Sequence, residues 1–314
     1  MEVYHKCCVI LLPFLLSGGN VYNKKEAFQG LTFVTPAIII LGIFVFVSIA
    51  FSVLISFFRV NLFTGTYTFI GLENYTRIFS DNQARIAFIN TMSFVAVVVP
   101  IQTFLSLVIA SVLNAKIKGR LQFRIIYFLP TLTSSAALTM IFMFLFSLFG
   151  PVNQFALLLG ILREPINFLH NANFALQVIM AMNIWSTIPF FMSIYLAGLQ
   201  EIPETLYESA KVDGANSMQQ FFKITVPMLK PITAFVVLMG IVGTFQMFDQ
   251  AFIFSGGSGG PENSTLTVAL LIYRNAFGQN NTMGFAAALA ITLALLIFIV
   301  SGIARRINKS ESVY

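Results

Sequence analysis

The sequence predicts an all-α integral membrane protein with about six transmembrane helices. Of its 314 residues, 57% are apolar and only 10% are charged, whereas soluble proteins carry about 25% charged residues. The charged residues also leave long apolar segments between them. About 20 apolar residues are enough for a helix to cross the hydrocarbon core of a bilayer. We therefore expect lipid to be the main solvent of this chain.

Six apolar segments are long enough to cross a bilayer, and they predict one transmembrane domain over residues 31–304. In chain order the predicted spans are Leu31–Phe58, Ile86–Leu113, Arg124–Leu148, Phe174–Leu199, Pro231–Phe254 and Met283–Ala304. Proline occurs in the first four spans, at Pro36, Pro100, Pro130 and Pro189. Membrane helices tolerate proline where neighbouring helices or cavity water satisfy the freed carbonyl groups. We therefore expect kinks there rather than helix ends.

The positions of lysine and arginine predict that both termini lie in the cytoplasm, because cytoplasmic loops retain these residues. Of the 18 basic residues, five fall on the outer side in this topology: Arg59, Arg77, Arg85, Arg163 and Arg274. The cytoplasmic side holds Lys6, Lys24, Lys25, Lys116, Lys118, Arg120, Arg124, Lys211, Lys223, Lys230, Arg305, Arg306 and Lys309. This bias sets the predicted orientation.

Residues 1–30 are predicted to form a cytoplasmic N-terminal extension, and residues 305–314 a cytoplasmic tail. Within the extension, Cys7–Ser17 is an apolar run that resembles the core of a signal peptide. The run is too short to span a bilayer. Cleavage after it would leave two lysines outside, directly before the first span, against the charge rule. We therefore expect the extension to remain uncleaved.

The loop between the fourth and fifth spans, residues 201–231, is predicted to fold as two short helices joined by a turn. Ile202-Pro203-Glu204 favours a helix start, since proline presets φ and an acid suits the positive end of the helix dipole. Gly214 permits a sharp reversal. Ser217–Ile224 is expected to form the second helix, which Pro227 then ends. The loop is therefore predicted to be a rigid helix-turn-helix.

The same loop contains a recognisable motif. It reads Glu208-Ser209-Ala210-Lys211-Val212-Asp213-Gly214-Ala215, then Phe221-Phe222-Lys223-Ile224, then Val226-Pro227. This order resembles the EAA motif of ABC importer permeases, in which a glutamate-alanine-alanine triplet is followed by glycine, then isoleucine, then leucine-proline. Ser209 replaces the second-position alanine and Val226 replaces the leucine, and both changes keep the size class of the residue.

Other segments resemble the sugar-permease branch of that family, which includes the maltose and glycerol-phosphate permease subunits. Gly71-Leu72-Glu73-Asn74-Tyr75 is similar to an outer-loop pattern of the branch. Asn90-Thr91 is similar to the start of its second helix, and Phe248-Asp249 to part of its fifth. Each segment is a weak signal alone, and their order along the chain carries the resemblance.

The resemblance implies a permease subunit of a bacterial ATP-binding-cassette importer in the cytoplasmic membrane, passing a sugar of mono- to oligosaccharide size. It implies that the loop docks in a groove of a separate ATPase subunit. The residues assigned to this ATPase coupling are Leu206, Tyr207, Glu208, Ser209, Ala210, Asp213, Gly214, Ala215, Ile224 and Pro227. The implied partners are a second, related permease subunit, two ATPase subunits and an extracytoplasmic solute-binding protein.

ATP hydrolysis is expected on the partner subunits, which would bind ATP and Mg. The sequence contains no G-x-x-x-x-G-K-[ST] phosphate-binding loop. We therefore expect no cofactor on this chain and no enzymatic activity of its own. The adjacent Cys7 and Cys8 lack metal-site spacing. The basic residues lie in short clusters between apolar runs rather than along one face, so nucleic acid is not an expected partner.

Polar residues in the fourth and fifth spans are candidates for the substrate pathway, because polar groups in membrane helices face a cavity or another helix. The candidates are Asn183, Trp185, Thr187, Gln246, Asp249 and Gln250. The last three fall at i, i+3 and i+4 and predict one polar stripe along a helix. Aromatic and amide groups together suit a sugar. Alternatively, Asp249 faces water at the outer boundary and the amides bond between packed helices.

An ion-gradient-driven secondary transporter or channel subunit is the main alternative function. Such proteins commonly use intramembrane acids and repeated broken helices. Within the predicted spans, Asp249 is the only acidic residue, and the sequence shows no evident repeat. The importer is therefore the preferred interpretation, and the identity of the sugar stays open.

Overall fold

The computed structural model describes residues 24–61, 65–114, 120–278 and 282–307. The predicted N-terminal apolar run Cys7–Ser17 and most of the predicted tail lie outside these residues. The chain divides into two compact units, Met1–Ser52 and Val53–Tyr314. Helices dominate both, as the sequence predicts.

The first unit consists, in its described part, of one apolar helix. Helix α2 (Lys24–Leu41), a π-helical segment η1 (Gly42–Val47) and α3 (Ser48–Ile55), which runs past the unit boundary, follow one another without a loop. Phe28–Ile55 is long and apolar enough to cross a membrane, and its most apolar window has no buried residue. The predicted first span is thereby confirmed as a helix. It ends before the predicted Phe58 because that residue begins a strand.

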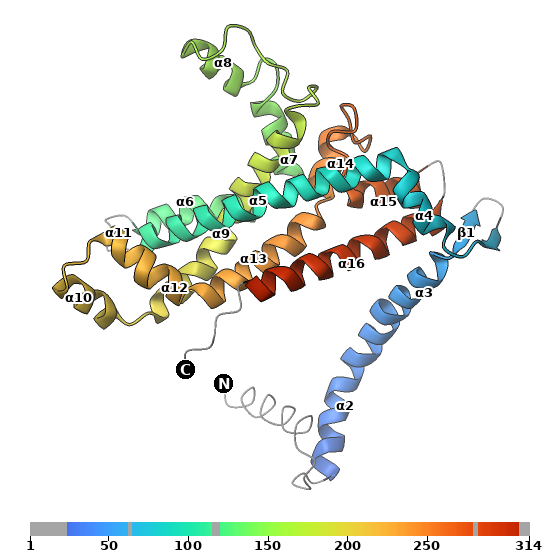
Figure 1. Ribbon diagram of the computed structural model, residues 1–314, viewed down its shortest axis with the longest axis horizontal. Coiled ribbons are helices and arrows are strands. Elements are labelled where there is room, and N and C mark those ends of the chain that lie inside the picture. The colour runs from blue at the N-terminus through green and yellow to red at the C-terminus, as the bar shows by residue number, and fades with distance from the viewer. Residues whose placement is uncertain (1–23, 62–64, 115–119, 279–281, 308–314) are drawn as a thin grey trace. The chain divides into compact units, whose positions relative to one another are not determined.

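Four long helices form the body of the second unit (Figure 1): α5 (Asn82–Asn114), α9 (Ala175–Glu201), α13 (Lys230–Phe245) and α16 (Met283–Ile307). Helix α5 packs along α9 and also against α13, which in turn contacts α16. Phe94, Tyr195, Phe245 and Leu289 are completely buried between them. Lipid tails are as apolar as these side chains, so close van der Waals packing rather than exclusion of water holds such helices together.

The predicted third span, Arg124–Leu148, is not one helix. It is divided into α6 (Arg120–Leu132) and α7 (Ser135–Leu145). Helix α6 ends at Leu132, and Ser134 caps α7, because its hydroxyl accepts a hydrogen bond from the backbone N–H of Ala137. Five helices in the described part of the chain are each long and apolar enough to cross a membrane. A sixth crossing requires α6 and α7 together and stays a prediction.

The predicted fifth span, Pro231–Phe254, is also interrupted. Helix α13 ends at Phe245, and α14 (Asp249–Ser255) begins after a non-helical Gln246–Phe248. Together they cover Lys230–Ser255, which is long enough to cross a membrane. The predicted second, fourth and sixth spans each match one long helix. Pro100 and Pro189 lie inside continuous helices and do not end them, as predicted; the kinks expected there stay a prediction.

A small β-hairpin departs from the predicted all-α fold. Strand β1 (Phe58–Asn61) pairs antiparallel with β2 (Thr66–Phe69), and α4 (Glu73–Ser80) follows. The amide of Asn74 donates to the backbone oxygens of Ser56 and Phe58 at 2.8 and 3.1 Å. The conspicuous Gly71–Tyr75 segment therefore has a local structural role, namely holding the hairpin on α4.

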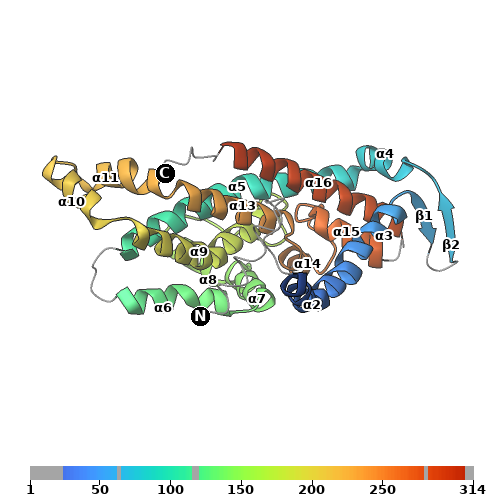
Figure 2. The ribbon, with the colours of Figure 1, turned by 90° about the horizontal axis from the view of Figure 1, so that it is seen from below.

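Shorter helices complete the second unit: α8 (Pro151–Leu158), α10 (Glu204–Val212), α11 (Ser217–Gln220), the π-helical η2 (Phe221–Thr225), α12 (Val226–Met228) and α15 (Val268–Phe277). Figures 1 and 2 both place α10 and α11 at one end of α5 and the β-hairpin at the other. The loop that carries the motif thus lies at one end of the helix bundle, far along α5 from the hairpin.

Candidate functional site

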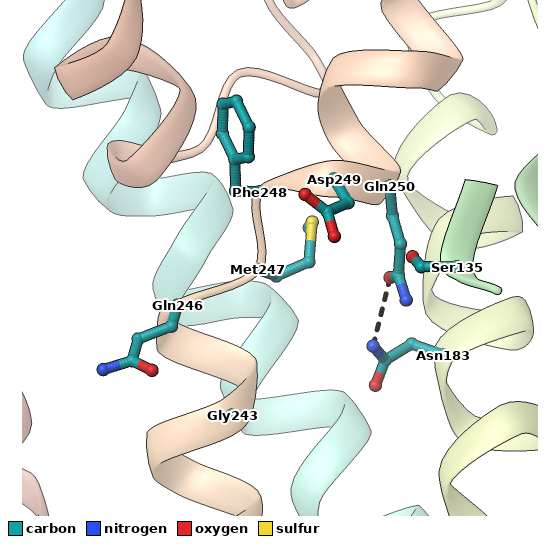
Figure 3. Close-up of a pocket in the computed structure, with 8 residues that line it drawn as sticks. All are labelled: Ser135, Asn183, Gly243, Gln246, Met247, Phe248, Asp249 and Gln250. Atoms are coloured by element: carbon teal, nitrogen blue, oxygen red, sulfur yellow. Dashed lines mark hydrogen bonds between the residues drawn. The ribbon is translucent and has the colours of Figure 1, made fainter. Parts of the chain in front are cut away.

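A polar pocket lies where α13 is interrupted (Figure 3). It is lined by Ser135, Asn183, Gly243, Gln246, Met247, Phe248, Asp249 and Gln250. Its volume is about 180 Å³, below the roughly 300–1,000 Å³ of complete small-molecule sites. Gln246 and Asp249 are exposed at its edge. The pocket is therefore open, and smaller than a complete small-molecule site.

The interruption itself creates the pocket. Helix α13 closes with the N–H of Gln246 bonded to the oxygen of Val242, and the chain runs non-helically through Met247 and Phe248 before α14 begins. The hydroxyl of Thr267 donates to the freed oxygen of Met247 at 3.1 Å. Non-helical backbone at membrane depth persists only where protein buries it or where it lines a cavity. Both conditions are met here.

Asn183 of α9 forms one wall of the pocket. Its side-chain nitrogen donates to the Gln250 side-chain oxygen at 3.0 Å, which links α9 to the start of α14. The residue is 8% exposed, and its own side-chain oxygen has no partner among the described residues. Leaving a buried polar atom unpaired costs about 1–3 kcal/mol.

The structure brings four of the six predicted pathway residues together, namely Asn183, Gln246, Asp249 and Gln250. The predicted reason for the last three is wrong, because α13 ends at Phe245 and they share no helical stripe. Trp185 and Thr187 do not line the pocket. The Trp185 ring lies 5.7 Å from that of Phe142 and is 47% exposed. Thr187 contacts α5 instead.

Sequence reasoning missed Ser135, Gly243, Met247 and Phe248 as pocket residues. Ser135 comes from α7, directly after the break that divides the third predicted span. Several serine and threonine residues follow Pro130 in the sequence. They were the available signal for this break, because their hydroxyls compete with the helical backbone for hydrogen bonds. The other three required knowledge that the fifth span is interrupted.

The loop after α9 folds as the predicted helix-turn-helix. Gly214 has φ +78°, a left-handed conformation that favours glycine, and it closes the turn after α10. Asn216 caps α11 reciprocally with Gln219, at 2.8 and 2.9 Å. The predicted second helix Ser217–Ile224 is α11 continued by η2. The prediction that Pro227 ends it is wrong, because α12 follows directly and Pro227 lies in its first turn, where the missing N–H of proline is tolerated. The turn is therefore held by both backbone geometry and side-chain hydrogen bonds.

The ten residues assigned to ATPase coupling do not all face outward. The hydroxyl of Tyr207 lies 2.9 Å from that of Thr225, and its ring packs against the apolar cluster of α9 and α13. Ala210, Ala215 and Ile224 are half-buried. The exposed members are Leu206, Glu208, Ser209, Asp213, Gly214 and Pro227. Tyr207 thus joins the two arms of the loop.

Two apolar residues that the sequence reasoning did not select flank the turn. Val212 at the end of α10 is 88% exposed, and Met218 in α11 is also exposed. The turn between them is polar apart from Gly214 and Ala215, so these two side chains form an apolar tip. Both side chains are accessible to a partner that binds the loop.

Comparisons with known proteins identify the family of this chain. The family model for the binding-protein-dependent transport system inner membrane component matches residues 102–313. The lactose transport system permease protein of Rhizobium radiobacter is 36% identical over 277 residues, covering 87% of this chain and 91% of the relative. The multiple sugar-binding transport system permease protein of Streptococcus mutans is 32% identical, covering 94% and 99%.

The fold has also been seen in a solved structure. A chain of a bacterial alginate ABC transporter, in complex with an alginate pentasaccharide-bound periplasmic protein, superposes with a TM-score of 0.78 at 22% identity and covers 91% of this chain and 97% of that one. With its long apolar helices, the chain belongs to the family of binding-protein-dependent transport system inner membrane components, as a multi-pass permease subunit.

Proposed function

We propose that the chain is the translocation subunit of an ATP-binding-cassette importer that brings a sugar into the cell. The observation that carries this proposal is the polar pocket at the α13–α14 interruption, in a family member whose relatives are named for lactose and for multiple sugars. Amide and carboxylate groups at the pocket match the hydroxyls of a sugar, and Phe248 offers an apolar ring face.

The proposed partners follow from what the chain leaves incomplete. The small pocket, open at Gln246 and Asp249, calls for a second, related permease to supply the opposing wall. The sequence lacks a phosphate-binding loop, so two ATPase subunits would bind ATP and Mg. A solute-binding protein outside the membrane would deliver the sugar, as the family description implies.

Two helices connect the pocket to the proposed ATPase-binding loop. Helix α9 runs from Asn183 to Glu201 without a break, a rise of roughly 27 Å, and leads into α10. Helix α13 returns from the loop to Gly243 at the pocket. Movement of the loop on an ATPase subunit would therefore displace both walls of the pocket. The hydrogen bond between the hydroxyls of Tyr207 and Thr225 would limit how far the loop absorbs that movement.

Reconstitution of the complete complex in proteoliposomes tests the function. With ATP on the side of the ATPase subunits, we expect uptake of at least one radiolabelled sugar from a panel of lactose, maltose, trehalose and arabinooligosaccharides, the sugars that relatives are named for. Uptake should require the binding protein. Uptake that an ion gradient drives without ATP would contradict the proposal and favour a secondary transporter.

Asp249→Asn tests the pocket as the pathway. Hydrogen bonds to charged groups contribute about 1.5–3 kcal/mol, so we expect sugar uptake to fall about tenfold at subsaturating sugar while the subunits still copurify. Glu164→Gln, an exposed acid in the loop before α9, is the matched control and should transport normally. If Asp249→Asn took up sugar at the wild-type rate, Asp249 would face water and would have no role in the substrate pathway.

Gly214→Leu tests the coupling turn. A side chain at φ +78° costs about 1–2 kcal/mol, yet among the described residues no atom other than those of its chain neighbours lies within 4 Å of the position a Cβ would take. We therefore expect normal membrane insertion but loss of ATPase-subunit binding, or of the ATP hydrolysis that loaded binding protein stimulates. Gly160→Leu, with φ +67° and equally open space, is the control for strain alone.

The Gly214 result is extended by a second variant. Val212→Asp keeps the turn unstrained but places a charge on the apolar tip. The same loss of ATPase-subunit binding in both variants would identify the tip as a contact surface. If Gly214→Leu gave full ATP hydrolysis, sugar uptake and copurification, the coupling assignment would be wrong.

The predicted orientation is tested by cysteine labelling after Cys7 and Cys8 are replaced by serine. Lys211→Cys should be protected from a membrane-impermeant thiol reagent in sealed cells, whereas Arg163→Cys and Glu262→Cys should be labelled. All three side chains are exposed in the structure, so reagent access depends on the side of the membrane. Labelling at position 211 from outside would reverse the topology.

A further inference from the structure

A glutamine is buried deep in the helix bundle, beyond the pocket. Gln102 of α5 is 1% exposed and lies where α5 meets α9 and α13. The hydroxyl of Thr187, on α9, donates to its side-chain oxygen at 2.8 Å. The side-chain nitrogen of Gln102 has no partner among the described residues. An apolar residue of the same size would avoid the cost of that unpaired group, about 1–3 kcal/mol.

A glycine makes room for the Gln102 amide. A Cβ at Gly240 of α13 would lie 2.5 Å from the Gln102 side-chain nitrogen, closer than real Cβ contacts allow. The Gln102 amide therefore packs directly against the backbone of α13 at Gly240, while its oxygen accepts a hydrogen bond from Thr187 of α9. Pro100 and Pro189 lie two residues from Gln102 and Thr187 respectively, so both helices lack a backbone hydrogen bond close to this contact. The contact between Gln102 and Thr187 therefore joins α5 and α9 at a point where each helix lacks one backbone hydrogen bond.

Both contacts of Gln102 lead to a wall of the pocket. The Thr187 hydroxyl also lies 2.8 Å from the backbone oxygen of Asn183, one turn earlier in α9. A hydroxyl has one proton and donates to one acceptor at a time, so the two contacts are coupled. On the other side, Gly240 precedes Gly243, which lines the pocket, by about one turn of α13. Gln102 thus lies between the supports of the two walls.

We propose that Gln102 is a positioning residue for the pocket: through Thr187 and Gly240 it fixes the separation of Asn183 on α9 from the end of α13, and so helps to select which sugar passes. It does so without touching the sugar, since it does not line the pocket. This inference rests on the proposed function. It extends that function from the residues that line the pocket to Gln102, which sets the distance between them.

The first test compares sugars rather than total rates. Gln102→Leu and Thr187→Val each remove the bond between α5 and α9 while keeping side-chain size. We expect the ratio of uptake rates for the two sugars of the panel that the wild type transports fastest to change about threefold, the size of an average side-chain hydrogen bond between membrane helices. The double variant should change it no further, because both substitutions break one bond.

A matched control separates positioning from simple destabilisation. Thr292→Val removes a hydroxyl that bonds only the backbone of its own helix α16, to Ala288 at 2.8 Å. This variant should keep the wild-type ratio. Loss of folded complex lowers the rates for both sugars equally and leaves their ratio unchanged. Wild-type ratios in Gln102→Leu and Thr187→Val would overturn the assignment.

The second test changes the close contact between Gly240 and Gln102. Gly240→Ala should lower the thermal unfolding temperature of the purified complex and shift the sugar ratio, because the new methyl group meets the Gln102 amide. Combining it with Gln102→Ala should restore the unfolding temperature in part. Gly302→Ala, on α16 with open space around its Cβ position, is the control.

These tests fail differently from a test of the function. A wild-type complex that takes up no sugar contradicts the proposed function itself. An active wild type whose sugar ratio is unaffected by the variants contradicts only the role of Gln102. Absence of any rescue of Gly240→Ala by Gln102→Ala would show that the two residues are not in contact and would also overturn the role.

Discussion

Backbone hydrogen bonding in lipid is the constraint on which this structure depends, because an unpaired peptide group costs several kcal/mol there. The chain interrupts two of its apolar segments nonetheless, at Thr133–Ser134 and at Gln246–Phe248. The helices that follow the two breaks, α7 and α14, pack against each other. Ser135 from the first break lines the same pocket as Gln246 from the second. Irregular backbone is therefore concentrated at one place, which is the place that holds the polar side chains.

The unbroken helices have the complementary role. Helix α9 carries a pocket residue near its beginning and continues into the loop at its end, while α13 begins at that loop and ends at the pocket. A helix transmits displacement along its axis because each turn is bonded to the next. At the loop, the hydrogen bond between Tyr207 and Thr225 links the segment after α9 to the segment before α13. Near the pocket, Gln102 of α5 contacts both helices. The proposed binding pocket and the proposed coupling loop are thus joined by the most regular parts of the chain.

The sequence predicted the spans well and their interruptions poorly. Apolar length alone identifies a membrane helix, so five segments matched long helices. The same apolar runs continue through both breaks, which depend on local hydroxyl and amide groups that hydropathy does not register. Asn183 and Asp249 were found because a polar residue in an apolar span is conspicuous. Gln102 is equally conspicuous and was missed, although the polar residues Thr103 and Ser106 lie one and four positions after it on α5. The inward packing of Tyr207 required tertiary contacts.

The exposed polar groups at the pocket edge show what the isolated chain lacks. Asp249 and Gln246 are exposed beside a pocket within a segment long enough to cross a membrane. A charge at the bilayer centre costs about 2.5–3.5 kcal/mol on insertion scales. Water or another protein is therefore a more favourable cover for this edge than lipid is. The proposed second permease would supply such a cover, and it would account for a pocket that one chain builds only in part.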